Sequence, residues 1–95
     1  GVVPIDPEQR AWREAVGREL REQRTEDGRT LADVAGESGV STQYLSEIER
    51  GHKEASSEVL FAVASALGVS LSDLMISTSG KLLALEAERM TRLAA

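Results

Sequence analysis

The sequence contains no cysteine and only one residue each of Trp, Tyr and Phe. Without cysteine, neither a disulfide framework nor a thiolate zinc site can form, and nothing indicates an oxidising compartment. We therefore expect a cytoplasmic protein. Because aromatic side chains are so few, Leu, Val and Ala must build the core, and such a core favours helices.

Long apolar stretches are missing as well. No run approaches the roughly 18 residues that a membrane span requires, and no signal-peptide pattern opens the chain, so we expect a soluble protein. The 95 residues leave room for one compact core rather than two domains. Gly1 stands where an initiator Met is usual, and we expect the natural protein to extend beyond this sequence.

Residues that carry chemistry are sparse. His52 is the single histidine, and acids alternate with bases at a helical spacing of four, as in Glu14, Arg18 and Glu22. Catalysis needs His, Cys or carboxylate groups that converge in a pocket, and neither metal-ligand spacing nor a glycine-rich phosphate loop is visible. The sequence therefore predicts no enzyme, no metal site and no cofactor.

The first half of the chain carries start signals for three helices. Asp6–Glu26 is the first, with Pro7 at its first helical position and apolar residues at intervals of three and four. Thr30–Ser38 is a short second helix that begins with a variant of the capping box. Ser41–Arg50 is the third, with a serine cap.

The second half predicts a helix, a single helical turn and a separate last helix. Ser56 or Ser57 caps the fourth helix, and Ser70–Ile76 repeats the capping pattern for one turn. Ser77–Gly80 consists of small polar residues and glycine, so we place a linker and a boundary there. Beyond it, Lys81–Ala95 is predicted to be amphipathic, with an apolar stripe formed by Leu82, Leu83, Ala87, Met90, Leu93 and Ala94.

Residues 31–50 fit the geometry of a helix-turn-helix, which is two short helices joined by a tight turn that contains glycine. Ala35 is small where the two helices would cross, Gly39 permits the turn, and Val40 lies beneath it. The expected interface between the helices consists of Val34, Leu45 and Ile48.

On residues 16–24, 39–51 and 60–70, the chain resembles the Cro/CI-type family of bacterial and phage repressors, also called the xenobiotic response element family. This resemblance covers about Val16–Ile76. It implies an all-α fold, a five-helix lambda-repressor-like DNA-binding domain over residues 7–76, to which an additional C-terminal helix is attached. Residues 44–58 are most similar to actinobacterial regulators that activate genes for Clp-type protease subunits.

The resemblance places the second motif helix, residues 41–50, in the DNA major groove. Thr42, Gln43 and Glu47 are then the residues that read bases. Their chemistry agrees, because Gln can bond adenine at two positions and Glu can accept a hydrogen bond from cytosine. The alternative is that these are ordinary solvated polar positions.

Contacts to DNA phosphates are expected from the N-terminus of the helix that Thr30 caps, and from side chains that follow. These are Ser41, Tyr44, Ser46, Arg50, His52 and Lys53. Tyr44 has an alternative role as a partly buried spacer, and His52 as a surface loop residue. Leu31 departs from the family, which often has a phosphate-binding Gln there.

Arg24 and Glu49 resemble a pair that forms a buried salt bridge in this family. We assign this pair a structural role, and expect the loss of one partner to cost roughly 3–5 kcal/mol if both are buried.

The last helix is the expected dimer element, because one recognition helix reads only a few base pairs. Its apolar residues Leu82, Leu83, Met90 and Leu93 would be exposed in a monomer. The alternative is that this helix folds back onto Trp12 and Val16 of its own chain.

The formal net charge of -5 is unusual for a protein that binds DNA. This charge leaves open the alternative that the chain is a protein-interaction module, such as an adaptor or an antitoxin-like partner, which uses this fold without binding DNA. Acidic surface also permits a contact with RNA polymerase. The terminal Leu93–Ala95 resembles degradation tags of Clp-type proteases, with ordinary helical alanine as the alternative.

Overall fold

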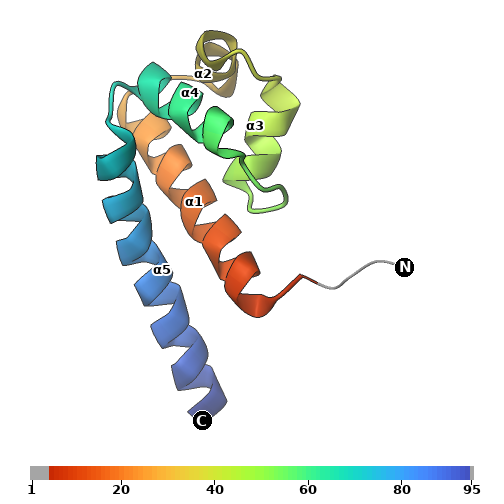
Figure 1. The fold of residues 1–95 in the computed structure, drawn as a ribbon, viewed down its shortest axis with the longest axis vertical. Helices are drawn as coiled ribbons and strands as arrows, with labels where there is room; N and C mark the ends of the chain where they lie inside the picture. The colour runs from red at the N-terminus through yellow and green to blue at the C-terminus, as the bar shows by residue number, and fades with distance from the viewer. Residues whose placement is uncertain (1–4, 95) are drawn as a thin grey trace.

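The computed structural model describes residues 5–94, and in that range the chain forms five α-helices and no strand (Figure 1). The helices are α1 (Pro7–Glu26), α2 (Leu31–Ser38), α3 (Thr42–Glu49), α4 (Ser57–Leu67) and α5 (Leu71–Ala94). The predicted all-α fold is confirmed, and the expected fifth helix and additional C-terminal helix are a single helix, α5. Ala95 lies outside the described residues, and with it the end of the proposed degradation tag.

Side-chain caps determine where the first four helices begin. Asp6, Ser41 and Ser56 each accept a hydrogen bond from a backbone N–H of the following turn, at 2.7, 3.0 and 3.2 Å. Thr30 and Asp33 form a complete capping box with two bonds of 3.0 Å. The bonds from Thr30 hold the pKa of Asp33 below its ordinary value. These starts follow from local sequence alone.

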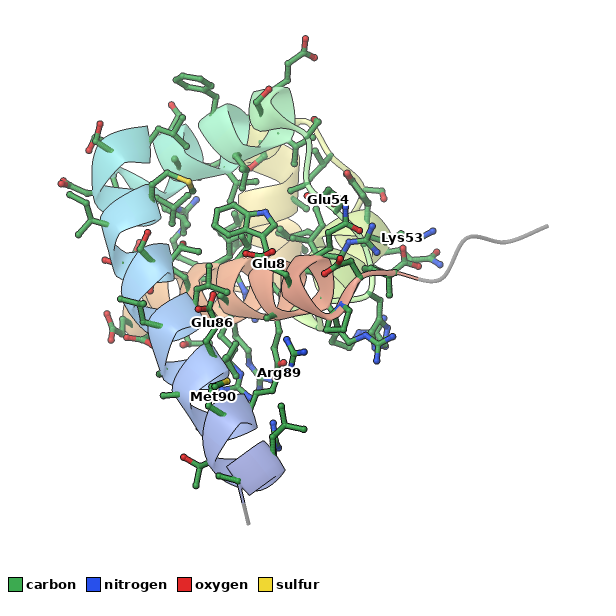
Figure 2. The ribbon with its side chains drawn as sticks, turned by 60° about the horizontal axis from the view of Figure 1, so that its bottom comes forward. Glu8, Lys53, Glu54, Glu86, Arg89 and Met90 are labelled. Atoms are coloured by element: carbon green, nitrogen blue, oxygen red, sulfur yellow. The ribbon has the colours of Figure 1, made fainter. Side chains whose placement is uncertain are left out.

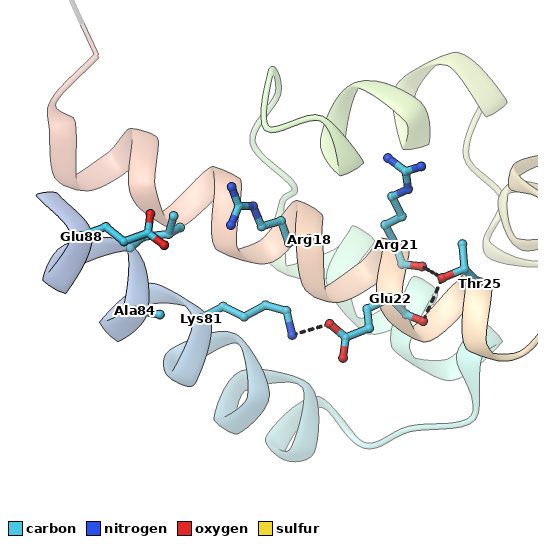
Figure 3. A pocket seen from close by; sticks show the side chains of 8 residues that line it. Arg18, Arg21, Glu22, Thr25, Lys81, Ala84 and Glu88 are labelled. Atoms are coloured by element: carbon cyan, nitrogen blue, oxygen red, sulfur yellow. Dashed lines mark hydrogen bonds and ion pairs between the residues drawn. The ribbon is translucent and has the colours of Figure 1, made fainter.

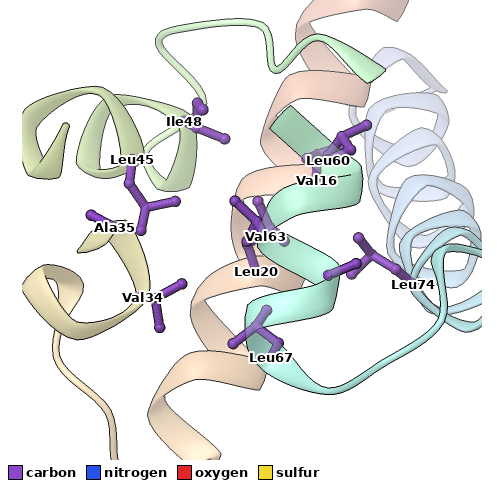
Figure 4. Close-up of a cluster of buried hydrophobic side chains, with 11 residues drawn as sticks. Val16, Leu20, Val34, Ala35, Leu45, Ile48, Leu60, Val63, Leu67 and Leu74 are labelled. Atoms are coloured by element: carbon purple, nitrogen blue, oxygen red, sulfur yellow. The ribbon is translucent and has the colours of Figure 1, made fainter. Parts of the chain in front are cut away.

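One core joins all five helices (Figure 4). Ala35 is fully buried in α2, and Gly39 takes the left-handed conformation, with φ of +73°, in the turn before α3. The turn and the small residue bring the two motif helices together. The core consists of Val16, Leu20, Val34, Ala35, Leu45, Ile48, Leu60, Val63, Ala64, Leu67 and Leu74.

The linker predicted at Ser77–Gly80 is wrong, because α5 runs through these residues without a break. Leu74, Thr78 and Leu85 are buried along one face of α5, and the Thr78 hydroxyl donates to the Leu74 carbonyl at 2.7 Å. Burial along a continuous helical face outweighs the low helix propensity of Ser and Gly. The single turn and the last helix are therefore one element.

Helix α5 packs antiparallel against α1 and diverges from it towards the C-terminus (Figure 1). Glu19 of α1 is only 2% exposed, and its carboxylate accepts hydrogen bonds from Lys81 at 2.7 Å and Gln23 at 2.8 Å. Lys81 also pairs with Glu22 at 2.8 Å (Figure 3). Its bonds with Glu19 and Glu22 raise the pKa of Lys81. This ion-pair cluster fixes α5 to the side of α1.

Candidate nucleic-acid interface

Helix α3 presents one apolar face to the core and one polar face to solvent. Leu45 and Ile48 are buried, whereas Thr42 and Gln43 are exposed and Glu47 is half-buried. This alternation follows from the spacing of three and four residues along a helix. The three predicted base readers therefore lie on α3 in positions that the core does not need.

Two of these side chains contact each other. The amide nitrogen of Gln43 donates to the carboxylate of Glu47 at 3.3 Å, across one turn of α3. A Gln amide nitrogen carries two hydrogens, so one donor and the carbonyl oxygen stay available for an adenine edge. Glu47 is thus placed to hold Gln43 in position, besides its predicted role as a base reader.

Several residues predicted to contact phosphate already have structural partners. Ser41 caps α3, and Thr30 caps α2. Tyr44 is half-buried against the core, and its hydroxyl donates to the Glu54 carbonyl at 2.9 Å, which ties α3 to the loop that follows it. This bond agrees with the spacer role weighed for Tyr44. Ser46 is half-buried, and its backbone carbonyl accepts a hydrogen bond from the Arg50 side chain at 3.4 Å.

The basic residues after α3 are more accessible. Arg50, His52 and Lys53 are exposed, and among residues 5–94 none of the three makes an ion pair. Leu31, the departure from the family pattern, is half-buried against the core at the start of α2. The exposed basic residues available for a phosphate contact therefore lie in the segment that follows α3 in the chain, rather than at the start of α2.

Arg24 and Glu49 form a nearly buried ion pair between α1 and the end of α3. The guanidinium donates to both carboxylate oxygens, at 2.8 and 2.9 Å, and the side chains are 12% and 6% exposed. Arg24 also donates to the Arg29 carbonyl at 2.8 Å. The hydrogen bonds to Glu49 raise the pKa of Arg24. The pair connects the first helix to the helix that carries the predicted base readers.

Gly17 of α1 lies directly against the backbone of α3, a contact that was not predicted from the sequence. A Cβ atom on this residue would lie 2.5 Å from the Glu49 carbonyl oxygen and closer still to that of Ile48. The two helices therefore touch through their backbones, next to the Arg24 ion pair. A glycine inside an otherwise regular helix was the signal that could have identified this contact.

The predicted dimer residues differ in exposure. Leu83, Met90 and Leu93 are exposed, but Leu82 is half-buried against its own chain. Leu85, which was not predicted, is buried. The last helix thus folds back onto α1, as the alternative predicted, and still leaves an apolar face uncovered.

Neither a metal site nor a membrane span is evident in the described part of the chain. Over residues 5–94, no three His, Asp or Glu side chains converge in a way that could hold a metal ion. No single helix there is long and apolar enough to cross a membrane, and α4 and α5 pass that test only as a pair bent by 103°.

Comparison with known proteins gives a consistent result. A family model described as helix-turn-helix matches residues 20–74. The transcriptional regulator ClgR of Mycobacterium tuberculosis is 49% identical over 80 residues, which span 84% of this chain and 70% of that protein. The crystal structure of the clp gene regulator ClgR from Corynebacterium glutamicum is 46% identical and superposes with a TM-score of 0.78, covering 86% of this chain and 88% of that one.

A more distant structure contains DNA. The restriction-modification controller protein C.Esp1396I, solved as a tetramer with its natural 35 base-pair operator, is 25% identical with a TM-score of 0.70. The match covers 76% of this chain and 95% of that one.

Proposed function

Because the chain belongs to the helix-turn-helix family of transcriptional regulators, in the group of ClgR-type Clp gene regulators, we propose that it binds operator DNA as a homodimer and activates Clp-type protease genes. The relatives are regulators and not enzymes. The resemblance to the Cro/CI-type family seen in the sequence is confirmed.

The polar face of α3 carries this proposal. Thr42 and Gln43 are exposed, and Gln43 is bonded to Glu47. This face lies opposite the buried Leu45 and Ile48. A protein-interaction module would need neither this arrangement nor the exposed cations that follow α3.

Selection of bound duplexes from a random DNA library, at near-physiological salt, tests whether the protein recognises a specific DNA sequence. The parent protein should enrich a two-fold symmetric motif with half-sites about one helical turn apart. The Gln43→Ala variant should lose preference at one position of each half-site, by about 1–3 kcal/mol of discrimination. If the parent enriches no sequence even at low salt, the interaction module becomes the better explanation.

The proposed dimer contact is the outer face of α5. Ile76, Leu83 and Met90 follow one another at intervals of seven residues and are exposed, whereas Leu74 and Leu85 on the opposite side are buried. An interval of seven keeps side chains on one face and is the repeat of helix–helix seams. Pairing of two such faces would remove these apolar side chains from water.

The Leu83→Glu variant is expected to be a monomer, because the dimer would bury two like charges in the middle of the seam. Its apparent affinity for a two-half-site operator should fall by about a hundredfold, within the range gained by linking two binding modules. Sedimentation and operator titration measure both effects. Ser77→Glu adds the same charge to an exposed position beside the seam and should stay dimeric. A dimeric Leu83→Glu protein would reject this interface.

The other partners stay predictions. Activation implies a contact with RNA polymerase, and the C-terminal Leu93–Ala95 sequence predicts degradation by a Clp-type protease. Equal lifetimes in cells of the parent and a form with Asp at the last two positions would count against the degradation signal. Binding to genomic DNA also implies that the protein works in the cytoplasm.

A further inference from the structure

The loop after α3 lies against the N-terminal half of α1. A Cβ atom on Gly51 would be 3.3 Å from the Glu14 Cα, and the Arg13 guanidinium pairs with Glu54 at 3.3 Å. Figure 2 shows Lys53 and Glu54 beside the start of α1. A groove of about 380 Å³ runs between the two segments, lined by Ile5, Arg10, Arg13, Glu14, Arg50, Gly51 and His52.

Positive charge predominates around this groove. Arg10, Arg13, Arg50 and Lys53 are four of the eleven Lys and Arg residues in a chain that has sixteen acids. His52 lies among them. The groove therefore has a charge opposite to that of the protein as a whole.

The acids nearby already have partners, and Asp6, next to Ile5, accepts the bond that caps α1. Glu14 pairs with Arg18 at 2.7 Å, on the next turn of α1. Within residues 5–94, the Glu54 carboxylate has one partner, Arg13 at 3.3 Å, and both of these side chains are partly exposed. An exposed pair of this kind is weak and can exchange for another anion. Arg10 makes no ion pair within the described residues.

We propose that this groove binds the phosphate backbone of DNA outside the bases that α3 reads, with Arg10 and Arg13 of α1 as phosphate contacts. The inference rests on the proposed function. Arg50 immediately follows α3, so the groove continues the contact surface from the recognition helix onto α1. One strand offers a phosphate about every 3.4 Å along the helix axis, and a row of cations can contact successive ones. Such contacts add affinity without reading sequence.

Salt titration of DNA binding tests the proposal, with the selected operator and a scrambled duplex of equal length as probes. Each substitution removes one phosphate contact from each subunit of the dimer, so the slope of log K against log salt should become shallower by about 2 for Arg10→Ala, and by about 4 when Arg13→Ala is added. Affinity should fall by the same factor on both duplexes, and base preference should not change. Arg21→Ala is the matched control, because Arg21 is an exposed arginine of α1 that lines a different groove, which lies between α1 and α5.

An operator shortened to the bases under α3 provides the second measurement. On this duplex the parent and the Arg10→Ala variant should bind alike, because the outer phosphates are absent. If Arg10→Ala keeps the parent slope on the long duplex, as Arg21→Ala should, the groove does not bind phosphate although the protein binds DNA. If the parent binds neither duplex, the proposed function fails, and this inference fails with it.

Discussion

Replacing Gly17 with alanine is expected to lower the free energy of unfolding by about 3 kcal/mol, the upper end of the usual cost of overpacking. The added methyl would lie 2.5 Å from one backbone carbonyl oxygen of α3 and 2.8 Å from its carbon. Backbone atoms cannot rotate away as a side chain can. The α1–α3 contact must therefore open, and the core beneath it loses packing.

Gly36→Ala is the control for this prediction. Gly36 lies in α2, is exposed, and would place a Cβ with no neighbour within 4 Å. The same substitution should therefore raise stability there by about 0.5–1 kcal/mol, because alanine is the better helix former. Urea unfolding of the two variants should give changes of opposite sign. A Gly17→Ala protein as stable as the parent would show that the two helices do not touch through their backbones.

The helix starts could be predicted because their causes are local. Thr30 and Asp33 lie three residues apart, and the bonds between them need no other part of the chain. The interruption predicted at Ser77–Gly80 failed for the opposite reason. Whether those residues stay helical depends on Leu74 and Thr78 being buried against other helices, which the local sequence does not encode.

The same distinction between local and long-range causes applies to the candidate nucleic-acid interface. The positions of Gln43 and Glu47 on α3 follow from the motif and its periodicity. Glu19 lies on the apolar face of α1, four residues after Ala15, and its partner Lys81 is 62 residues away, so the local sequence does not show that Glu19 is a buried, paired carboxylate. Arg10 and Arg13 share a face of α1, but only the fold shows that the loop after α3 lies beside them.

The Arg24→Met variant should lose about 3–5 kcal/mol of stability, because Glu49 would be left as a buried charge without its partner. Arg18→Met is the matched control. Arg18 and Glu14 form a pair on the same helix at a similar distance, 2.7 against 2.8 Å, but their side chains are 55% and 43% exposed. Removal of that exposed pair should cost about 0.5 kcal/mol or less. Equal losses in the two variants would mean that burial of Glu49 does not set the cost.

A second substitution separates the lost attraction from the stranded charge. Adding Glu49→Leu to Arg24→Met removes the uncompensated carboxylate, and this should recover most of the lost stability. DNA affinity is the other discriminating measurement. If Arg24 only holds α1 against α3, the double variant should bind the operator with nearly the parent affinity once the folded fraction is accounted for. If Arg24 itself contacts phosphate, the double variant will be stable and still bind weakly, with a shallower salt dependence.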